Sequence, residues 1–235
     1  GPKAETMRAL GEKISAKELA ERAKVPTLPW AKVQADENLE SAAERVGYPL
    51  LLKASAGGGG KGMRRVNSPL ELRDAAESAS AEAVSAFGDG TLFIERLVEN
   101  PRHIEVQVFG DGKGGGVHFF ERECSLQRRH QKVWEEAPAP NLSDEVRNGI
   151  FGASLRLVSE VKYQSAGTIE FLVDEKDGFY FLEMNTRLQV EHPVTEEVTG
   201  HDLVHLQLKL AVSPVQFNLP KIDAPRGHSI EVRIY

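Results

Sequence analysis

The segments Thr168-Ile169-Glu170-Phe171-Leu172-Val173 and Phe179-Tyr180-Phe181-Leu182-Glu183-Met184-Asn185 flank the turn-rich run Asp174-Glu175-Lys176-Asp177-Gly178. Aromatic and β-branched runs on both sides of such a turn predict a β-hairpin. If Asp174 pairs with Phe179, Glu170 lies opposite Glu183, and Asn185 points to the same face. Directly opposed like charges destabilise a sheet, so these oxygen-bearing side chains predict a cation site, best suited to Mg²⁺ with positions open for phosphate oxygens. The alternative is a solvated face that carries a chance pair of acids.

The overall composition narrows the class of protein. A chain of 235 residues, 40% of them hydrophobic, is sufficient for one large domain or two small ones. A net charge of −6 argues against nucleic acid as the main partner. No apolar run approaches the roughly 20 residues of a membrane span, so we expect no membrane association. The single cysteine, Cys124, excludes an internal disulfide, fits a reducing compartment and is more typical of a buried small residue than of a nucleophile.

Helix and strand signals alternate along the chain. Helices are expected over 4–24, 37–46 after an Asp36 cap, 69–87 after a capping box at Ser68, 143–161 with Ser143 as N-cap, and 202–212. Strands are expected over 48–54, 63–66, 91–97, 103–109, 116–123 and 229–235, and a loop over 186–199. Hairpins that alternate with helices predict an α+β fold with antiparallel sheets rather than a doubly wound parallel sheet. The last strand, with no chain after it, suggests a fragment.

A run of four glycines, Gly57 to Gly60, precedes Lys61 and Gly62. Its letters satisfy G-x-G-x-x-G, but a strand rather than a helix is expected to follow, which argues against a dinucleotide fingerprint. A Walker loop fails because Gly62 stands where Ser or Thr is needed. The remaining interpretation is a hairpin loop that closes over phosphates, with Lys53 on the preceding strand supplying a point charge. The alternative is a flexible turn, but four glycines are costly in folding entropy.

Two further groups carry polar chemistry. Glu95 ends a strand and could accept an adenine amine, with the backbone of Arg96 and Val98 reading the ring edge; an ordinary hinge salt bridge is the simpler alternative. His103, Glu105 and Gln107 alternate on one strand face, which we expect to lie over something wet.

The loop after the hairpin is dense in functional groups. Arg187 offers a planar fork for an anion, and Glu191 offers a base nearby. His192, directly before Pro193, has a structural role or a chemical one.

Long motifs in chain order resemble biotin carboxylase, the ATP-grasp part of acetyl-, propionyl-, methylcrotonyl-CoA and pyruvate carboxylases. They are Lys53 with Gly57-Gly58-Gly59-Gly60-Lys61-Gly62-Met63, Glu99 to Gln107, Glu121 to Lys132, Glu183 to Glu196, and Glu231-Val232-Arg233-Ile234. The resemblance covers essentially the whole chain. It implies an ATP-grasp fold with a leading helix over 1–26, a small glycine-loop lid lobe over 27–95 and a larger antiparallel-sheet lobe over 96–235. The family's N-terminal and C-terminal domains are expected to be absent.

The resemblance also implies roles for individual residues. The nucleotide would contact Lys13, Lys53, the loop glycines Gly58, Gly59 and Gly60, Glu95, Arg96, Val98, His103, Gln127 and His130. Mg²⁺ or Mn²⁺ would be held by Glu170, Glu183 and Asn185. The bicarbonate site would be lined by Lys132, Arg187, Gln189 and Val190. Glu191 would deprotonate bicarbonate, and Arg233 would stabilise the biotin enolate.

The implied reaction is that of a ligase: ATP, bicarbonate and biotin give carboxybiotin, ADP and phosphate through carboxyphosphate. No Ala-Met-Lys-Met-like site exists, so the biotin must sit on a separate carrier or another part of a longer chain. A carboxyltransferase component, a homodimer, and a cytoplasmic or mitochondrial-matrix location are further implications. Two alternatives stay open: an MgATP-binding module without turnover, and another ATP-grasp ligase of the carbamoyl-phosphate-synthetase type.

Overall fold

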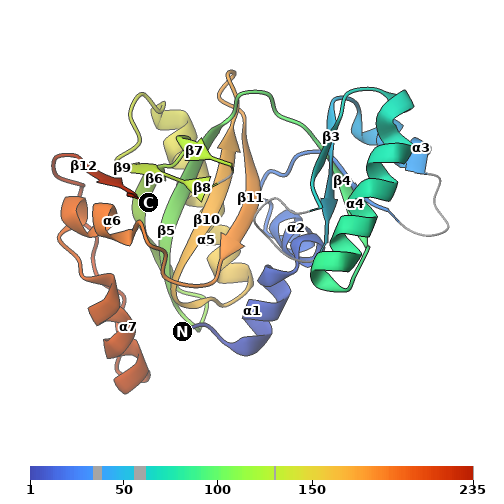
Figure 1. Cartoon of the computed structure of the whole chain (residues 1–235). Helices are drawn as coiled ribbons and strands as arrows, with labels where there is room; N and C mark the ends of the chain where they lie inside the picture. Colours follow the sequence, from blue (N-terminus) through green and yellow to red (C-terminus); the bar gives the residue numbers. More distant parts are fainter. Residues whose placement is uncertain (34–38, 56–61, 130, 235) are drawn as a thin grey trace. The chain divides into compact units, whose positions relative to one another are not determined.

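The computed structural model describes residues 1–33, 39–55, 62–129 and 131–234. They form two compact units. The first comprises Gly1–Gly11, Ser15–Pro26 and Asn100–Tyr235, and the second comprises Glu12–Ile14 and Thr27–Glu99. Each unit contains an antiparallel sheet with helices packed against it, so the predicted α+β class is confirmed (Figure 1). Three earlier expectations lie outside the described residues: the Asp36 cap, the loop glycines and His130.

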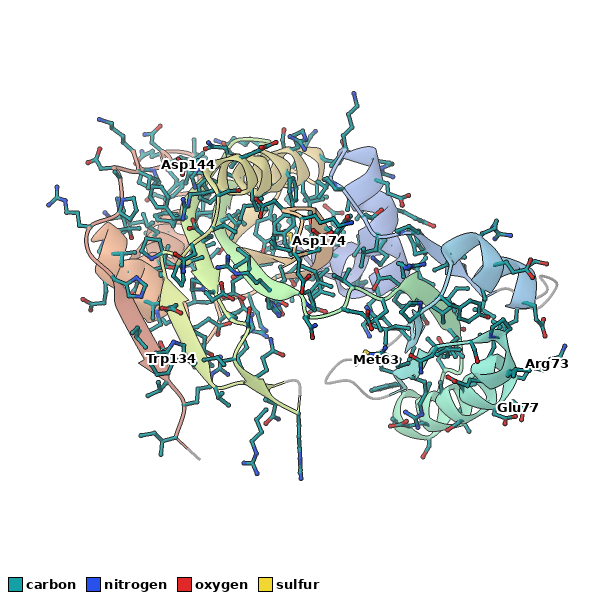
Figure 2. The ribbon with its side chains drawn as sticks, turned by 90° about the horizontal axis from the view of Figure 1, so that it is seen from above. Met63, Arg73, Glu77, Trp134, Asp144 and Asp174 are labelled. Atoms are coloured by element: carbon teal, nitrogen blue, oxygen red, sulfur yellow. The ribbon has the colours of Figure 1, made fainter. Side chains whose placement is uncertain are left out.

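The second unit is built on a four-stranded sheet in the order β1-β4-β2-β3. Its strands are β1 (Trp30–Lys32), β2 (Leu50–Ala54), β3 (Arg64–Val66) and β4 (Leu92–Arg96). The helices α3 (Leu39–Val46) and α4 (Leu72–Phe87) contribute Ala and Leu side chains to the same buried core as Leu50, Leu52 and Ile94. The outer face of α4 is polar, and Figure 2 shows Arg73 and Glu77 extending outward from it.

The capping box before α4 differs in detail from the prediction. A short 3₁₀ helix, η1 (Pro69–Glu71), precedes α4, and the Ser68 hydroxyl makes no capping bond to the helix backbone. The Glu71 carboxylate instead accepts the backbone N–H of Asn67 at 2.9 Å. The 3₁₀ turn tightens the helix entry, so the reciprocal capping geometry of an α-helix does not form there.

The first unit is built on a six-stranded antiparallel sheet in the order β11-β10-β5-β6-β9-β12, with a two-stranded β7-β8 hairpin beside it. The strands are β5 (Arg102–Asp111), β6 (Gly116–Glu123), β7 (Gln127–Arg128), β8 (Gln131–Lys132), β9 (Trp134–Ala137), β10 (Gln164–Val173), β11 (Phe179–Asn185) and β12 (Ser229–Val232).

Gly110 of β5 lies against the backbone of Tyr163. A Cβ at this position would lie 2.1 Å from the Tyr163 carbonyl oxygen, so only glycine fits.

Helices cover both faces of this sheet (Figure 1). The long helix α5 (Asp144–Glu160) packs with Ile104, Val106 and Val108 of β5, and α1 (Ala4–Gly11) and α2 (Lys13–Arg22) contribute to the same core. Helices α6 (His192–Thr199) and α7 (Leu203–Val212) cover the other face, where Leu203 and Leu210 meet Phe109 and Phe119. Because side chains alternate along a strand, His103, Glu105 and Gln107 point to the α6 face.

Near its turn, the β10-β11 hairpin pairs in a register that differs by one residue from the predicted register. Phe179 pairs with Val173, not with Asp174. A bulge between Glu170 and Phe171 then skips one residue of β11, and this shift restores the predicted pairing of Glu170 with Glu183. The expected neighbours are therefore confirmed, but the turn is one residue longer than the sequence indicated.

Two helix predictions also need correction. The single helix expected over 4–24 is two helices, α1 and α2, interrupted at Glu12. The loop expected over 186–199 contains α6, which begins at His192 with Pro193 in its first turn. Pro suits the first helical turn because the N–H that it lacks would have no partner within the helix there. His192 therefore starts a helix, and its Nδ1 lies 2.8 Å from the Gln189 carbonyl oxygen.

The predicted N-cap of α5 is confirmed, and it gives a matched pair of variants. The Ser143 hydroxyl accepts the backbone N–H of Val146 at 3.3 Å. We expect Ser143→Ala to lower the free energy of unfolding by about 1 kcal/mol, because a helix-end donor loses its acceptor. Ser68→Ala is the control, with an expected change within about 0.5 kcal/mol. Urea denaturation measures both, and equal losses would contradict the assigned cap.

Candidate functional site

Four charged residues form a row across the sheet of the first unit. Arg122 on β6 pairs with Glu105 on β5, Glu105 pairs with Glu170 on β10, and Glu170 pairs with Glu183 on β11. Three carboxylates on neighbouring strands repel one another unless positive charge lies close to them. The row therefore marks a place in this unit where cations are required.

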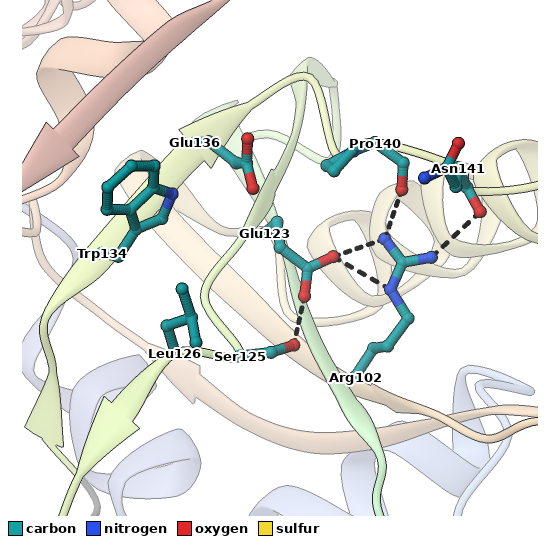
Figure 3. Close-up of a pocket in the computed structure, with 8 residues that line it drawn as sticks. All are labelled: Arg102, Glu123, Ser125, Leu126, Trp134, Glu136, Pro140 and Asn141. Atoms are coloured by element: carbon teal, nitrogen blue, oxygen red, sulfur yellow. Dashed lines mark hydrogen bonds and ion pairs between the residues drawn. The ribbon is translucent and has the colours of Figure 1, made fainter.

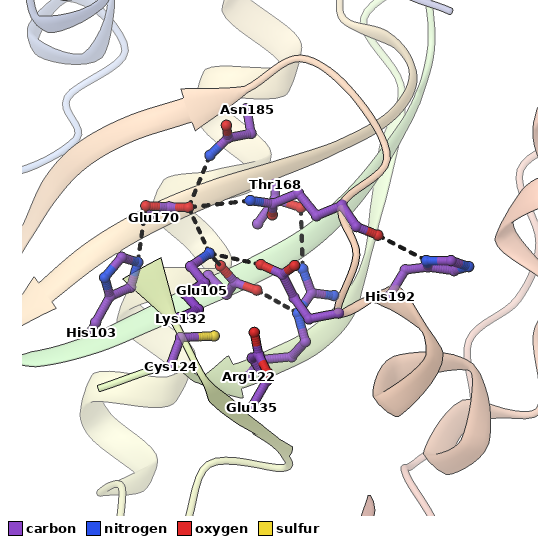
Figure 4. A network of polar contacts seen from close by, with 12 residues as sticks. His103, Glu105, Arg122, Cys124, Lys132, Glu135, Thr168, Glu170, Asn185 and His192 are labelled. Atoms are coloured by element: carbon purple, nitrogen blue, oxygen red, sulfur yellow. Dashed lines mark hydrogen bonds and ion pairs between the residues drawn. The ribbon is translucent and has the colours of Figure 1, made fainter. Parts of the chain in front are cut away.

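Lys132, at the end of β8, brings positive charge to this row (Figure 4). Its Nζ lies 2.5 Å from Glu105 Oε2, 2.9 Å from Glu170 Oε1 and 2.7 Å from Glu191 Oε1. Glu191 directly precedes α6, so the helix start carries this third carboxylate to the sheet. Glu105 and Glu191, which are 86 positions apart in the sequence, thus share the ammonium group of Lys132.

Burial and charge act in opposite directions on these groups. Burial alone would raise the pKa of Glu105, but the charges of Arg122 and Lys132 outweigh it and lower that pKa to about 2. Burial would also raise the pKa of Glu170, which His103 and Lys132 lower to about 2. Burial would lower the pKa of Lys132, yet Glu105 and Glu170 raise it well above its ordinary range. Glu105, Glu170 and Lys132 therefore stay charged near neutral pH.

These pKa directions predict acid sensitivity. The pKa of Glu105 is about 2 in the folded chain and 4.5 as an ordinary group, so its contribution to stability is complete above pH 4.5 and is lost as pH falls towards 2. We expect the free energy of unfolding of the wild type to fall more between pH 5 and pH 3 than that of Glu105→Gln. Urea unfolding at the two pH values measures this difference. Equal pH dependence in both proteins would contradict it.

Arg122 is completely buried and is bonded by polar groups from several elements. Its guanidinium donates to Glu105 Oε1 at 2.5 Å, and its other contacts are Gln107 Oε1 at 2.8 Å, Thr195 Oγ1 at 2.9 Å and Thr168 Oγ1 at 3.2 Å. Glu105 and Gln107 are themselves 0% exposed, so the expectation that this strand face lies over something wet is wrong. The face is polar because it surrounds a buried cation, not because it meets water.

Several predicted nucleotide and metal residues converge on Glu170. His103 Nε2 lies 2.9 Å from Glu170 Oε2, and Asn185 Nδ2 donates to Oε1 at 2.8 Å. Gln189 Nε2 donates to the same Oε1 at 3.3 Å, and the Gln127 amide lies 2.9 Å from His103 Nδ1. Glu170, Asn185 and the register-paired Glu183 stay the predicted metal ligands.

The residues predicted to bind bicarbonate, to deprotonate it or to stabilise the biotin enolate fall into two groups. Arg233 Nη2 lies 2.9 Å from Glu191 Oε2, so each oxygen of Glu191 faces a different cation, Lys132 or Arg233. Arg187 is exposed and donates to Asn185 Oδ1 at 3.2 Å, while the Val190 side chain is 60% exposed. Lys132, Glu191 and Arg233 are thus in contact, whereas Arg187 and Val190 lie towards solvent.

The second unit carries its own predicted residues. Glu95 is 1% exposed, and its carboxylate is bonded by Lys53 Nζ. Lys13 Nζ donates to the Ala54 carbonyl oxygen at the end of β2 at 3.2 Å. Lys13 is therefore held by β2, and Lys53 by Glu95 of β4, the strand that pairs with β2. Arg96 ends β4, and Val98 follows it, half-buried. Gly58, Gly59, Gly60 and His130 lie outside the described residues.

Three residues that hold the site together were not predicted to do so from the sequence. The alternation pattern placed Glu105 on a polar strand face without assigning it a role, and no role was predicted for Arg122 or Glu135. The sequence signal that could have found them is a charged residue on the inward face of a predicted strand. Charged side chains are rarely buried unless they are paired, so such a residue indicates a buried ion pair. Cys124 is buried as expected, and burial raises the pKa of its thiol well above the ordinary range.

A shallow cavity of about 430 Å³ lies elsewhere in the first unit (Figure 3). Its lining includes Arg102, Glu123, Leu126 and Trp134, and Arg102 is held by Glu123 and by the carbonyl oxygens of Pro140 and Asn141. Among the predicted site residues that the structure describes, none lines this cavity. It is therefore distinct from the Lys132 cluster.

The two antiparallel sheets, with a cluster of acids and cations on the larger one, match the ATP-grasp fold of solved biotin carboxylase structures. Comparison with known proteins identifies the family to which the chain belongs. The profile described as "Carbamoyl-phosphate synthase L chain, ATP binding domain" matches residues 12–216, and the chain belongs to that family. Biotin carboxylase 2 of Bacillus subtilis is 50% identical to this chain over 238 residues, which cover 100% of this chain and 53% of that protein.

Solved structures show the same fold. The Campylobacter jejuni biotin carboxylase–β,γ-ATP complex has a TM-score of 0.91 and 46% identity, covering 99% of this chain and 52% of its own. The biotin carboxylase domain dimer of Hydrogenobacter thermophilus 2-oxoglutarate carboxylase, in complex with MgADP, ADP and bicarbonate, has a TM-score of 0.91 and 45% identity, covering 99% and 52%. The chain thus spans about half the length of these relatives. Within the described ranges, no helix has both the length and the apolar character needed to cross a bilayer.

Proposed function

We propose that this chain is the ATP-binding part of a biotin carboxylase, which uses ATP and bicarbonate to convert biotin to carboxybiotin, with ADP and phosphate as the other products. The observation that carries the proposal is the Lys132–Glu191–Arg233 contact beside Glu170. It joins a base, two fixed cations and a predicted metal ligand within one network, and the related proteins named above are biotin carboxylases.

Glu191 is the base of the proposed reaction. Bicarbonate is a poor nucleophile, and removal of its proton makes it reactive towards the γ-phosphoryl group of ATP. Lys132 holds Glu191 at 2.7 Å and neutralises charge beside it. Arg187, Gln189 and Val190 complete the proposed bicarbonate site, with Arg187 supplying a planar fork for the anion.

The predicted metal ligands fit a hard divalent cation. Glu170 and Glu183 supply opposed carboxylates and Asn185 supplies an amide, which are the ligand types that Mg²⁺ and Mn²⁺ accept. When bound, such ions would neutralise charge on the ATP phosphates. His103 and Gln189 each contact Glu170, so they orient the carboxylate that would hold the ion.

In the second unit, Lys13 and Lys53 are the proposed phosphate contacts, and Glu95, Arg96 and Val98 the proposed adenine contacts. Lys53 is bonded to the buried Glu95, so one strand pair fixes both groups. Residues 27–95 with the loop glycines act as a lid that excludes water from carboxyphosphate, while His103, Gln127 and His130 of residues 96–235 contact the nucleotide.

After bicarbonate attacks the γ-phosphorus, ADP leaves and carboxyphosphate forms. Its breakdown gives CO₂ and phosphate, and the phosphate takes the N1 proton of biotin. The resulting enolate is anionic, and the guanidinium of Arg233 stabilises it before it attacks CO₂. The biotin is carried on a separate protein or domain, and a carboxyltransferase component then uses the carboxybiotin.

The decisive experiment measures phosphate release by this chain with MgATP and free biotin, in the presence and absence of bicarbonate, beside a longer chain that includes the remaining half. Bicarbonate-dependent release supports the proposal. Hydrolysis that runs equally well without bicarbonate would refute it. Calorimetry that shows MgATP binding with no carboxylation in either chain would instead select a binding module without turnover.

A second candidate follows from the family match itself, whose description names carbamoyl-phosphate synthase. A ligase of that type would use ammonia or an amine as the acceptor. Phosphate release that depends on ammonia rather than biotin would favour it. The 50% identity with a biotin carboxylase over the whole chain favours the first proposal.

The Hydrogenobacter thermophilus relative is described as a domain dimer, and a homodimer is proposed here on that basis. We propose the cytoplasm, or the mitochondrial matrix of a eukaryote, as the location, because ATP and bicarbonate are both available there.

A further inference from the structure

Glu135 lies on β9, on the face of the sheet that carries the Lys132 cluster. It pairs in register with Glu231 on β12, and Arg233 is two residues further along the same chain segment. The Arg233 backbone N–H donates to the Val133 carbonyl oxygen at 3.0 Å, so the β9 pairing continues to this residue. Alternation then places Glu135, Glu231 and Arg233 on one face.

The Arg233 guanidinium is shared by two carboxylates. Its Nη2 lies 2.5 Å from Glu135 Oε1 and 2.9 Å from Glu191 Oε2. The Glu135 side chain is 0% exposed, and its Oε2 has no hydrogen-bond partner among the residues that the structure describes. Leaving a buried carboxylate oxygen unsatisfied costs folding free energy. A neutral residue would suit this position better if stability alone decided it.

The surroundings add to that cost. Burial raises the pKa of Glu135, the charge of Arg233 opposes the rise, and Glu191 and Glu231 add to it. Three carboxylates therefore compete for one guanidinium. Ionisable groups with pKa values shifted by burial and by neighbouring charges cluster at functional sites.

We propose that Glu135 is a positioning residue: it holds the Arg233 guanidinium in place beside Glu191, in the orientation in which its charge stabilises the developing anion. This inference rests on the proposed function, in which Arg233 stabilises the biotin enolate. Loss of the Glu135 contact would allow the guanidinium to turn about its contact with Glu191. The second contact, from β9, removes this freedom before substrate arrives, which is the preorganisation that electrostatic stabilisation requires.

The chain offers a matched control on the neighbouring residue. Glu136 lies on the opposite face of β9, and its carboxylate contacts His228 at 2.8 Å, away from Arg233. Glu135→Gln and Glu136→Gln remove the same charge from the same strand. A general effect of lost charge on β9 would appear in both variants, whereas a positioning effect would appear in the first alone.

Steady-state kinetics of bicarbonate- and biotin-dependent phosphate release test the proposal. We expect Glu135→Gln to lower kcat about tenfold or more with KM for ATP changed less than about twofold, because the lost interaction acts in the transition state. Glu136→Gln should match the wild type. In an Arg233→Met background, Glu135→Gln should cause no further loss. A further loss there, or equal losses in the two single variants, would overturn the proposal.

Thermal unfolding separates this claim from the proposed function, because it needs no turnover. Arg233→Met leaves Glu135 and Glu191 without their shared cation, so the double variant Glu135→Gln/Arg233→Met should melt at a higher temperature than Arg233→Met alone. Additive losses would overturn the contact between Glu135 and Arg233 even if the enzyme is active. Conversely, the expected coupling in a chain without bicarbonate-dependent hydrolysis would remove the proposed function and, with it, the catalytic part of the inference.

Discussion

Glu191→Gln is expected to lower bicarbonate-dependent ATP hydrolysis at least about a hundredfold, because a glutamine of the same shape cannot accept the proton of bicarbonate. Each oxygen of Glu191 faces a cation, Lys132 at 2.7 Å or Arg233 at 2.9 Å, so the base is held in a fixed orientation. The amide retains one acceptor oxygen, and MgATP binding should therefore persist. Phosphate release with and without bicarbonate, together with calorimetric binding of MgATP, measures the two effects.

Glu197→Gln is the control for this variant. Glu197 lies on the same helix, α6, but is exposed. It should retain wild-type hydrolysis. If Glu191→Gln kept the full bicarbonate-dependent rate, the assignment of Glu191 as the base would be lost.

Arg122→Met should lower the free energy of unfolding of the first unit by about 3–5 kcal/mol, which is the range for removing one partner of a buried ion pair. The variant would leave Glu105 as a buried carboxylate with Lys132 as its remaining cation, and Gln107 and Thr195 would each lose a donor. Methionine fills much of the volume, so the loss would report charge and hydrogen bonding rather than a cavity.

Urea denaturation followed by Trp134 fluorescence in a Trp30→Phe background measures this loss, because Trp134 lies in the first unit and Trp30 in the second. Arg22→Met on α2 is the control in the same unit: its side chain is 65% exposed and pairs with Glu160, so about 0–1 kcal/mol is expected. The double variant Glu105→Gln/Arg122→Met should recover part of the stability. Equal effects of Arg122→Met and Arg22→Met would show that the buried network contributes little.

Local patterns predicted a large part of the fold. The strand over 116–123 has the predicted bounds, and Ser143 caps its helix as the sequence indicated. Alternating apolar residues and turn residues also predicted the antiparallel α+β class. These features depend on neighbours within a few residues, and for that reason a single sequence is sufficient to recognise them.

Other features depended on cross-strand pairing. The bulge at Glu170 repositions one strand by a residue, and α6 forms where the sequence indicated a loop. The role of Arg122 was hidden because its four partners come from β5, β10 and α6. A period of two tells which residues share a face of a strand, but not which residue of another strand lies opposite.

The hairpin residues 168–185, with two acids and an amide, were enough to predict a cation-requiring face from the chain alone, because like charges on paired strands repel. The chain did not indicate that Lys132 is one of the cations, or that Glu105 and Glu191 share it, since these residues are 27 and 59 positions away from it. Their meeting depends on the order of strands in the sheet and on the start of α6. Burial then strengthens each of these charge contacts, and burial is a property of the packed structure rather than of any local segment.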